Sequence, residues 1–448
     1  MLTRRQFSKS LLTGGTALLA SETLLSTANL QARSNQSLGQ NSGQGSGQNL
    51  NQKPDQTFDL LIKGGTVIDP GQSLHGLLDV AVKGGKILEV ARDIPESRAL
   101  QVYSAKDKIV TPGLVDLHVH CFDGVGSGMN ADHYCLGRGV TTVVDAGSTG
   151  FIMIGAFIKR VVRTSNTRIY ALVDIGALGT MTIHQTANYY RDMYNPNFVL
   201  SQSTAKAARD NRPDVVGIKI HLDREVSSHP LDFEPELLKK AVEAAESSHL
   251  PLMVHAMNTA NPSPDLMKLM RKGDVFTHCY HGFANGILDA RGKILPGVRE
   301  ARERGILFDV GADRTGISFD VADQALQQDF LPDTISSDLT LPAAVHSTGD
   351  LPNVVSTMMA LGMNLEQAIE RVTIKPAQVF DYGVQLGTLR AGGEADIGIF
   401  EIRDEKFEFN DNFDFSATTL GKAGKRVGRQ RLVNKAAVCR GQLYVNEI

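Results

Sequence analysis

Residues 114–124 read LVDLHVHCFDG, and this stretch is the starting point for predicting the fold. It begins as an apolar run that predicts a buried β-strand, and His118 and His120 stand at its end. In an extended strand, residues i and i+2 point to the same face, with their Cα atoms roughly 6.5–7 Å apart. Two imidazoles at this spacing can converge on one metal ion, although a pair of structural histidines is also compatible with the pattern. The rest of the sequence must decide between a metal site and a pair of structural histidines.

Similar apolar runs recur along the chain, and helix-period segments such as 151–165 and 234–248 lie between them. This alternation predicts a parallel sheet, and eight strands predict a (β/α)₈ TIM-like barrel. The predicted strands are residues 114–120, 141–147, 168–178, 215–221, 250–256, 274–281, 305–313 and 334–340.

Residue types that bind metals concentrate at the ends of these predicted strands. In a barrel the carboxyl ends of the strands meet at one face, where active sites lie. Structural histidines would have no reason to gather there, so the pattern favours a metal site. The candidate residues are His118, His120, Lys219, His255, His278 and Asp338.

The two ends of the folded chain are rich in β-forming residues, at 58–70 and 77–93 and again at 387–402 and 431–448. We expect them to pair into one small β-sandwich beside the barrel. Glycine pairs at 64–65 and 84–85 predict hairpin turns. The predicted division is a sandwich part at 57–110, a barrel at 111–384 and a second sandwich part at 385–448.

The first 32 residues resemble a bacterial twin-arginine (Tat) export signal. Arg4 and Arg5 are followed by Phe7 and Lys9, then by an apolar run too short to span a membrane. Residues 33–56 are rich in Gly, Gln, Asn and Ser and predict a disordered linker. These features predict a periplasmic protein that contacts the Tat translocase during export.

Composition narrows the function further. The 448-residue chain has a net charge of −3, so it lacks the basic field of a nucleic-acid-binding protein. Its four cysteines are too few and too scattered for a disulfide scaffold. The sequence leaves open whether the chain forms a homo-oligomer.

Several motifs resemble those of the amidohydrolase superfamily. TPGLVDLHVH (111–120) is similar to its first-strand signature, and TIKPAQVF (373–380) and GTLRAGGEADIGIF (387–400) to its C-terminal hallmark. VVDAGSTG (143–150), VGIKI (216–220) and THCYHG (277–282) resemble a subgroup that includes deacetylases and dihydroorotases. The resemblance covers about residues 58–448.

The resemblance implies a role for each candidate residue. His118, His120 and Asp338 would bind one divalent ion, most simply Zn²⁺, and Asp338 would also be the general base. His255 and His278 would bind a second ion. Lys219, carboxylated by CO₂, would bridge the two ions. The implied reaction is hydrolysis of a small-molecule acyl ester or amide by a metal-bridging hydroxide.

Two departures from the resemblance affect substrate recognition. His221 stands where the subgroup often carries arginine, and Phe122 stands where dihydroorotases have an arginine for a carboxylate. His221 and His281 are candidate substrate contacts. Asp145 and Asp174, at predicted strand ends, could each be a partner of a histidine N–H, and Asp116 could equally be structural. The alternatives are a dihydroorotase- or hydantoinase-like cyclic amidase, an N-acyl amino acid hydrolase, and a metal-binding relative without catalysis.

Overall fold

The computed structural model describes residues 57–180, 196–223, 233–312, 315–345, 349–411 and 424–446. The predicted signal (1–32) and the whole of the predicted linker (33–56) lie before residue 57, outside these residues. None of the helices in the described ranges is long and apolar enough to cross a membrane.

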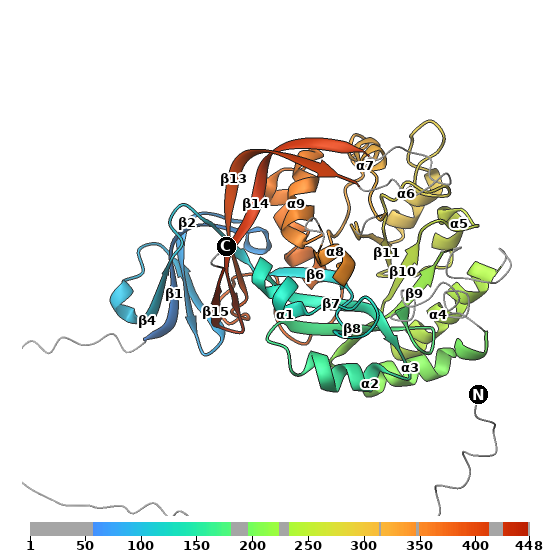
Figure 1. The fold of residues 1–448 in the computed structure, drawn as a ribbon, viewed down its shortest axis with the longest axis horizontal. Helices are drawn as coiled ribbons and strands as arrows, with labels where there is room; N and C mark the ends of the chain where they lie inside the picture. Colours follow the sequence, from blue (N-terminus) through green and yellow to red (C-terminus); the bar gives the residue numbers. More distant parts are fainter. Residues whose placement is uncertain are drawn as a thin grey trace, which may run out of the picture. The chain divides into compact units, whose positions relative to one another are not determined.

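A parallel sheet forms the centre of the described fold (Figure 1). Its strands follow one another in chain order, and every neighbouring pair is parallel. Parallel neighbours need crossover connections, which explains the helical segments between them. The seven strands are β6 (Leu114–Val119), β7 (Val140–Gly150), β8 (Arg168–Asp174), β9 (Val215–Leu222), β10 (Leu252–Ala256), β11 (Val275–Thr277) and β12 (Leu307–Phe308).

The predicted eighth strand, residues 334–340, is not a regular strand, and that prediction was wrong. It forms single parallel bridges, Thr334 with Asp309 after β12 and Leu339 with Val119 of β6. The segment thereby joins the last strand to the first. Its extended path is interrupted because Asp338 has φ +50°, in the left-handed region. The ring is therefore closed by an irregular segment that carries a candidate metal ligand.

Helices connect the strands and surround the sheet (Figure 1). The prediction of a helix over 234–248 is confirmed by α4, which buries Leu237, Leu238 and Ala241 on one face. The predicted helix over 151–165 is shorter, with α2 followed by the π-helical turn η4 (Ile158–Val162). The α-helices are α1 (Ala131–Tyr134), α2 (Ile154–Phe157), α3 (Ser201–Asp210), α4 (Glu234–Ser248), α5 (Ser263–Met267), α6 (Pro296–Glu303), α7 (Phe319–Leu326), α8 (Leu341–Val345), α9 (Leu351–Ala360), α10 (Leu365–Glu370) and α11 (Ile374–Ala377).

Strands from both ends of the folded chain share a second sheet. Its strands are β1 (Phe58–Asp69), β2 (Leu74–Lys83), β3 (Lys86–Ala91), β4 (Ala99–Ser104), β5 (Ile109–Pro112), β13 (Ile397–Asn410), β14 (Lys425–Cys439) and β15 (Gln442–Val445). The antiparallel pairing of β5 with β13 connects the two ends. One apolar cluster contains residues of both, including Val67, Val110 and Ile397. The closing of this sheet into a sandwich stays a prediction.

The two glycine pairs have different roles. Gly84 and Gly85, with φ +59° and +74°, form the turn between β2 and β3, as predicted. Gly64 and Gly65 instead lie inside β1, where the register with β2 shifts. A Cβ on Gly65 would lie 2.4 Å from the side chain of Val110. Gly64 and Gly65 therefore permit a bulge in β1 and the close approach of β5. The periodicity of the sequence alone could not distinguish this role from a hairpin turn.

Candidate metal centre

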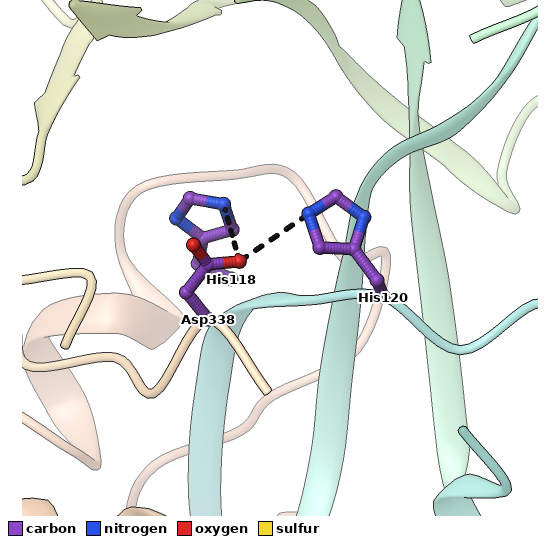
Figure 2. Close-up of side chains that lie close together, drawn as sticks. All are labelled: His118, His120 and Asp338. Carbon is purple, nitrogen blue, oxygen red and sulfur yellow. Dashed lines mark ion pairs between the residues drawn. The ribbon is translucent and has the colours of Figure 1, made fainter. Parts of the chain in front are cut away.

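Strand β6 supplies the first part of the site, and Asp338 faces it from the closing segment (Figure 2). His118 Nε2 is 3.2 Å and His120 Nε2 is 3.3 Å from the same carboxylate oxygen, Oδ1 of Asp338. The ligand atoms of the three residues lie within 4.8 Å of one another, close enough to hold a metal ion. The structure thus brings the two histidines of the opening motif to a carboxylate 218 residues beyond His120 (338 minus 120).

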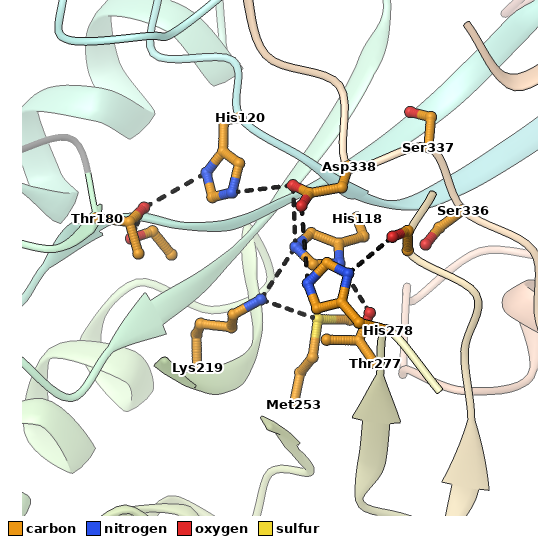
Figure 3. A network of polar contacts seen from close by, with 12 residues as sticks. His118, His120, Thr180, Lys219, Met253, Thr277, His278, Ser336, Ser337 and Asp338 are labelled. Atoms are coloured by element: carbon orange, nitrogen blue, oxygen red, sulfur yellow. Dashed lines mark hydrogen bonds and ion pairs between the residues drawn. The ribbon is translucent and has the colours of Figure 1, made fainter. Parts of the chain in front are cut away.

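Lys219 of β9 and His278, directly after β11, lie at the same place (Figure 3), and β10 carries a further candidate ligand, His255. Lys219 Nζ is 3.0 Å from His118 Nε2, and His278 Nε2 is 3.7 Å from Oδ2 of Asp338. The ring of His255 packs edge-on against that of His278, with 4.3 Å between centroids. All six candidate residues therefore gather at the carboxyl ends of the barrel strands.

Lys219 is almost fully buried in this cluster, with 1% of its surface exposed. Burial lowers the pKa of its amine to about 8, although the nearby carboxylate of Asp338 favours the charged form. An amine with this pKa is neutral in an appreciable fraction of molecules near pH 7.

The cluster suits cations because several of its buried ligand atoms lack hydrogen bonds. Within the described residues, His255 Nε2, His278 Nε2 and Asp338 Oδ1 make none. Buried polar atoms are normally hydrogen-bonded, so two imidazole nitrogens without a hydrogen bond, beside a carboxylate oxygen that has only its close contacts with His118 and His120, can take a cation as their partner. Burial lowers the pKa of His118 well below its usual value, against the opposing charge of Asp338, so this imidazole stays neutral as a metal ligand must.

A hydroxyl relay orients the first histidine. His118 Nδ1 lies 3.0 Å from the Oγ1 of Thr277, and that hydroxyl donates to Oδ2 of Asp309 at 2.7 Å. Asp309 also accepts hydrogen bonds from Thr334 and Ser336, so its carboxylate is held from three sides. No pattern in the sequence indicated this relay, although Thr277 directly precedes the candidate ligand His278.

The second histidine has a relay of the same kind. His120 Nδ1 lies 3.0 Å from the Oγ of Ser148, which donates to Asp145 at 2.7 Å. The same carboxylate accepts the backbone N–H of Cys121 at 2.8 Å. Asp145 was a candidate partner of a ligand histidine, and it acts through Ser148 rather than by direct contact. Such outer contacts set ring orientation and ligand basicity.

Backbone hydrogen bonds from β6 hold Asp338 in its left-handed conformation. Its N–H donates to the carbonyl of His118 at 2.7 Å, and the N–H of His120 donates to the carbonyl of Leu339 at 2.9 Å. Next to it, Asp116 accepts hydrogen bonds from the hydroxyl and the N–H of Ser337. The backbone of Asp338 is therefore anchored to the segment that carries His118 and His120.

The backbone of Gly311 and Gly316 lies close to His278 and holds its imidazole in place. His278 also has positive φ, +59°, and its Nδ1 is 2.7 Å from the carbonyl oxygen of Gly311. A Cβ on Gly311 or on Gly316 would lie 2.7 Å or 2.6 Å from that ring nitrogen. Glycine at both positions leaves room for the imidazole to turn its Nε2 towards Asp338.

The two candidate substrate residues are placed differently. His221 follows Lys219 on β9, pairs with His255 in the sheet register and stacks on its ring at 3.5 Å. With Asp223 and His255 it forms a second group whose ligand atoms lie within 4.8 Å. His281 is 2% exposed, and neither of its ring nitrogens has a hydrogen bond within the described residues. His221 lies in β9 and His281 follows β11, so both are close in sequence to candidate metal ligands.

This fold and ligand set define a barrel hydrolase of the metal-dependent kind. A model of the amidohydrolase family matches residues 109–427. A deacetylase from Enterococcus faecalis is 31% identical over 394 residues, covering 87% of this chain and 100% of its own. The chain belongs to the amidohydrolase family.

Other relatives and solved structures include a second deacetylase and proteins with other activities. A deacetylase from Agrobacterium fabrum is 28% identical, covering 75% of this chain and 81% of its own, and a dihydroorotase from Aquifex aeolicus is 23% identical, covering 77% and 90%. The crystal structure of an adenine deaminase superposes with a TM-score of 0.76 at 30% identity, covering 87% of this chain and 100% of that one. The crystal structure of a dihydroorotase superposes with a TM-score of 0.72 at 23% identity, covering 86% of this chain and 99% of that one. The family and the general class of reaction are therefore established, and the substrate is not.

Proposed function

We propose that this protein is a binuclear, deacetylase-like hydrolase that cleaves a small acyl ester or amide. One observation carries the proposal. The buried carboxylate of Asp338 faces the ligand nitrogens of His118, His120 and His278, at 3.2, 3.3 and 3.7 Å, in the rim where barrel enzymes act. The similarity to two deacetylases supports the reaction class.

His118, His120 and Asp338 would hold one cation, and His255 and His278 a second. Imidazole and carboxylate ligands suit zinc. When bound, the cations would lower the pKa of a water molecule and polarise the substrate carbonyl. Lys219 in its ammonium form has three donors and no acceptor. Its lowered pKa supports addition of CO₂ to the neutral amine, which would make it an oxygen ligand between the two positions.

Asp338 would be the general base. Burial alone would raise its pKa, but His118 and His120 outweigh burial and hold the pKa well below its usual range. The carboxylate is therefore ionised at neutral pH and can accept a proton from the attacking water. It would then return this proton to the leaving oxygen or nitrogen. The contacts of the Asp338 carboxylate with His118 and His120 would keep it oriented towards the attacking water.

The substrate would be recognised by residues around this centre, with His221 and His281 as candidates. Cyclic amidase activity is the second candidate function, because dihydroorotases are among the relatives. Phe122 argues against a dihydroorotase. Its side chain is 8% exposed and packs on Phe157 with 5.1 Å between ring centroids, so this position offers no cation for a substrate carboxylate. N-acyl amino acids remain compatible with amide cleavage.

The proposal also includes the cell compartment. If residues 1–32 act as a Tat signal, the chain crosses the membrane folded and works in the periplasm. Expression with and without Arg4→Lys plus Arg5→Lys, followed by cell fractionation, tests this. Periplasmic protein with the intact pair and retention with the double variant would support export.

The test of the reaction uses the full chain loaded with Zn²⁺. Elemental analysis should give about two ions per chain. The panel contains O-acetyl 2-hydroxy acids, N-acetyl amino acids, dihydroorotate, hydantoins and adenine. Asp338→Asn should lower turnover by at least about 10²-fold, the usual contribution of a general base. Asp320→Asn, an exposed aspartate of α7, is the control. Full activity of Asp338→Asn, or undiminished turnover after chelation, would refute the proposal.

A further inference from the structure

Strand β7 ends in a bulge beside the metal centre. Its pairing with β8 shifts register between Ala146 and Gly150, where β7 has more residues than its partner strand. The bulged residues, 147–149, belong to the VVDAGSTG motif (143–150), and this whole stretch is buried. A bulge bends its strand and redirects the side chains near it, and bulges are over-represented next to active sites. The β7 bulge therefore lies where it can orient ligands of the centre.

Gly147 brings the β7 bulge against the side chain of Lys219. In the sheet, β8 separates β7 from β9, which carries this lysine. Nevertheless, a Cβ on Gly147 would lie 2.8 Å from both Cβ and Cγ of Lys219, and 3.3 Å from Cβ of Asp174, the residue of β8 that pairs with Lys219. Cβ and Cγ are the first atoms of the lysine stem, so the β9 backbone fixes them and they cannot swing aside. Glycine at 147 thus leaves the space that this stem occupies.

The stem that packs on Gly147 leads directly into the centre (Figure 3). Lys219 Nζ lies 3.0 Å from His118 Nε2 and 3.6 Å from Sδ of Met253. Within the described residues these are the hydrogen-bond partners of Nζ, and a thioether is a weak acceptor. Because so few polar contacts hold the amine, the direction of the side chain depends on how its stem packs.

Hydrogen bonds hold the β7 bulge next to His120. Thr180 Oγ1 donates to the carbonyl oxygen of Gly147 at 3.0 Å and lies 3.4 Å from Nδ1 of His120. The Oγ of Ser148, the next residue of the bulge, lies 3.0 Å from the same ring nitrogen. One bulge therefore contacts a ligand of the first metal position and also the lysine proposed to bridge the two positions.

We propose that Gly147 is a positioning residue, whose missing side chain leaves the space through which Lys219 is directed to the place between the two proposed metal positions. This inference rests on the proposed function and deepens it, because it identifies what holds the bridging ligand. Addition of CO₂ forms one bond between Nζ and the carbon of CO₂ and releases one proton from the nitrogen to solvent. The resulting carbamate can bridge the two positions only if Nζ points into the centre. Gly147 acts only through Lys219.

The test compares two glycine variants of the full chain, loaded with Zn²⁺ in ¹³C-labelled bicarbonate. Gly147→Ala should remove the carbamate carbon signal in ¹³C NMR and weaken metal binding by about 10–100-fold, the usual effect of losing an outer partner of a metal ligand. Gly273→Ala is the matched control. Gly273 has φ +86°, close to the +83° of Gly147, but its new Cβ would have no atom within 4 Å. Both variants carry the same backbone strain, so the control should keep the signal and the metal.

Thr180→Val is a second variant, should Gly147→Ala not fold. It removes the hydroxyl that donates to Gly147 and keeps the shape of the side chain, so it should weaken the carbamate signal, which Thr180→Ser should restore. The proposal is overturned if Gly147→Ala keeps either the signal or the metal affinity of wild type, or if Gly273→Ala loses them equally. With Gly147→Ala unfolded, an undiminished signal in Thr180→Val would overturn it. Absence of the signal in wild type would instead count against the carboxylated lysine of the proposed function, so the two failures are distinguishable.

Discussion

Ser337 donates two hydrogen bonds to the buried carboxylate of Asp116, one from its hydroxyl and one from its backbone N–H at 3.1 Å. The same carboxylate lies 3.3 Å from the N–H of His118 and accepts from it. This contact joins β6 to the irregular segment at the residue before Asp338. The position of Asp338 thus depends on Asp116, a residue two places before His118.

Ser337→Ala should lower kcat more than it changes KM, because Asp338 would lose part of its positioning while substrate contacts stay in place. Loss of a buried hydrogen bond to a carboxylate should also cost about 1–3 kcal/mol of unfolding free energy. Steady-state kinetics and urea denaturation measure both effects. Ser248→Ala, which removes a buried hydroxyl bonded to Ala244 in α4, should affect only stability. Equal effects of the two variants on kcat would contradict the positioning role.

Thr277→Val should weaken metal binding by about 10–100-fold, since it cuts the relay from Asp309 to His118 while keeping the shape of the side chain. Asp309 retains the hydroxyls of Thr334 and Ser336, so the fold should persist. Metal retention after dialysis against a weak chelator measures the loss. Thr277→Ser restores the hydroxyl and should recover most of the affinity. If Val and Ser variants retain metal equally, the relay has no part in binding.

The Lys219 amine should react with CO₂ more readily as the pH rises through about 8, its lowered pKa, because only the neutral amine is nucleophilic. An unperturbed lysine would need a pH near 10.4 for the same neutral fraction. A carbamate carbon signal in ¹³C NMR with labelled bicarbonate should therefore appear already near pH 8. Lys219→Met should abolish it, and Lys268→Met, at an exposed lysine, should not. A signal that survives in Lys219→Met would assign the reaction elsewhere.

Gly311→Ala should displace His278 and lower the bound metal by about one equivalent per chain, because the site proposed for the second ion would lose one of its imidazoles. The new Cβ would lie 2.7 Å from Nδ1 of His278 and 2.5 Å from Oγ1 of Thr277, at a backbone φ of +51°. Gly155→Ala is the matched control, in α2 with no atom within 4 Å of the new Cβ. It should raise unfolding free energy by about 1 kcal/mol through helix propensity. Unchanged metal content in Gly311→Ala would contradict this prediction and show that the His278 imidazole can shift without loss of the metal.

Much of the fold follows from local pattern. The apolar runs that end at His118, Lys219 and His255 form strands of one parallel sheet, because hydrophobic period and segment length are properties of consecutive residues. Helix α4 has its predicted bounds for the same reason. Strand ends in a parallel sheet share one edge, so the gathering of ligand residue types there could be inferred without coordinates.

Tertiary structure alone decided how these residues are held. The left-handed backbone of Asp338, the relays through Thr277 and Ser148, and the bulge at Gly65 each depend on a partner remote in sequence. No local pattern specifies such a partner, because hydrogen-bond geometry and steric fit arise only when separate segments pack. Local sequence pattern predicts which side chains lie at the rim of the barrel, and packing between distant segments sets the orientation of each one.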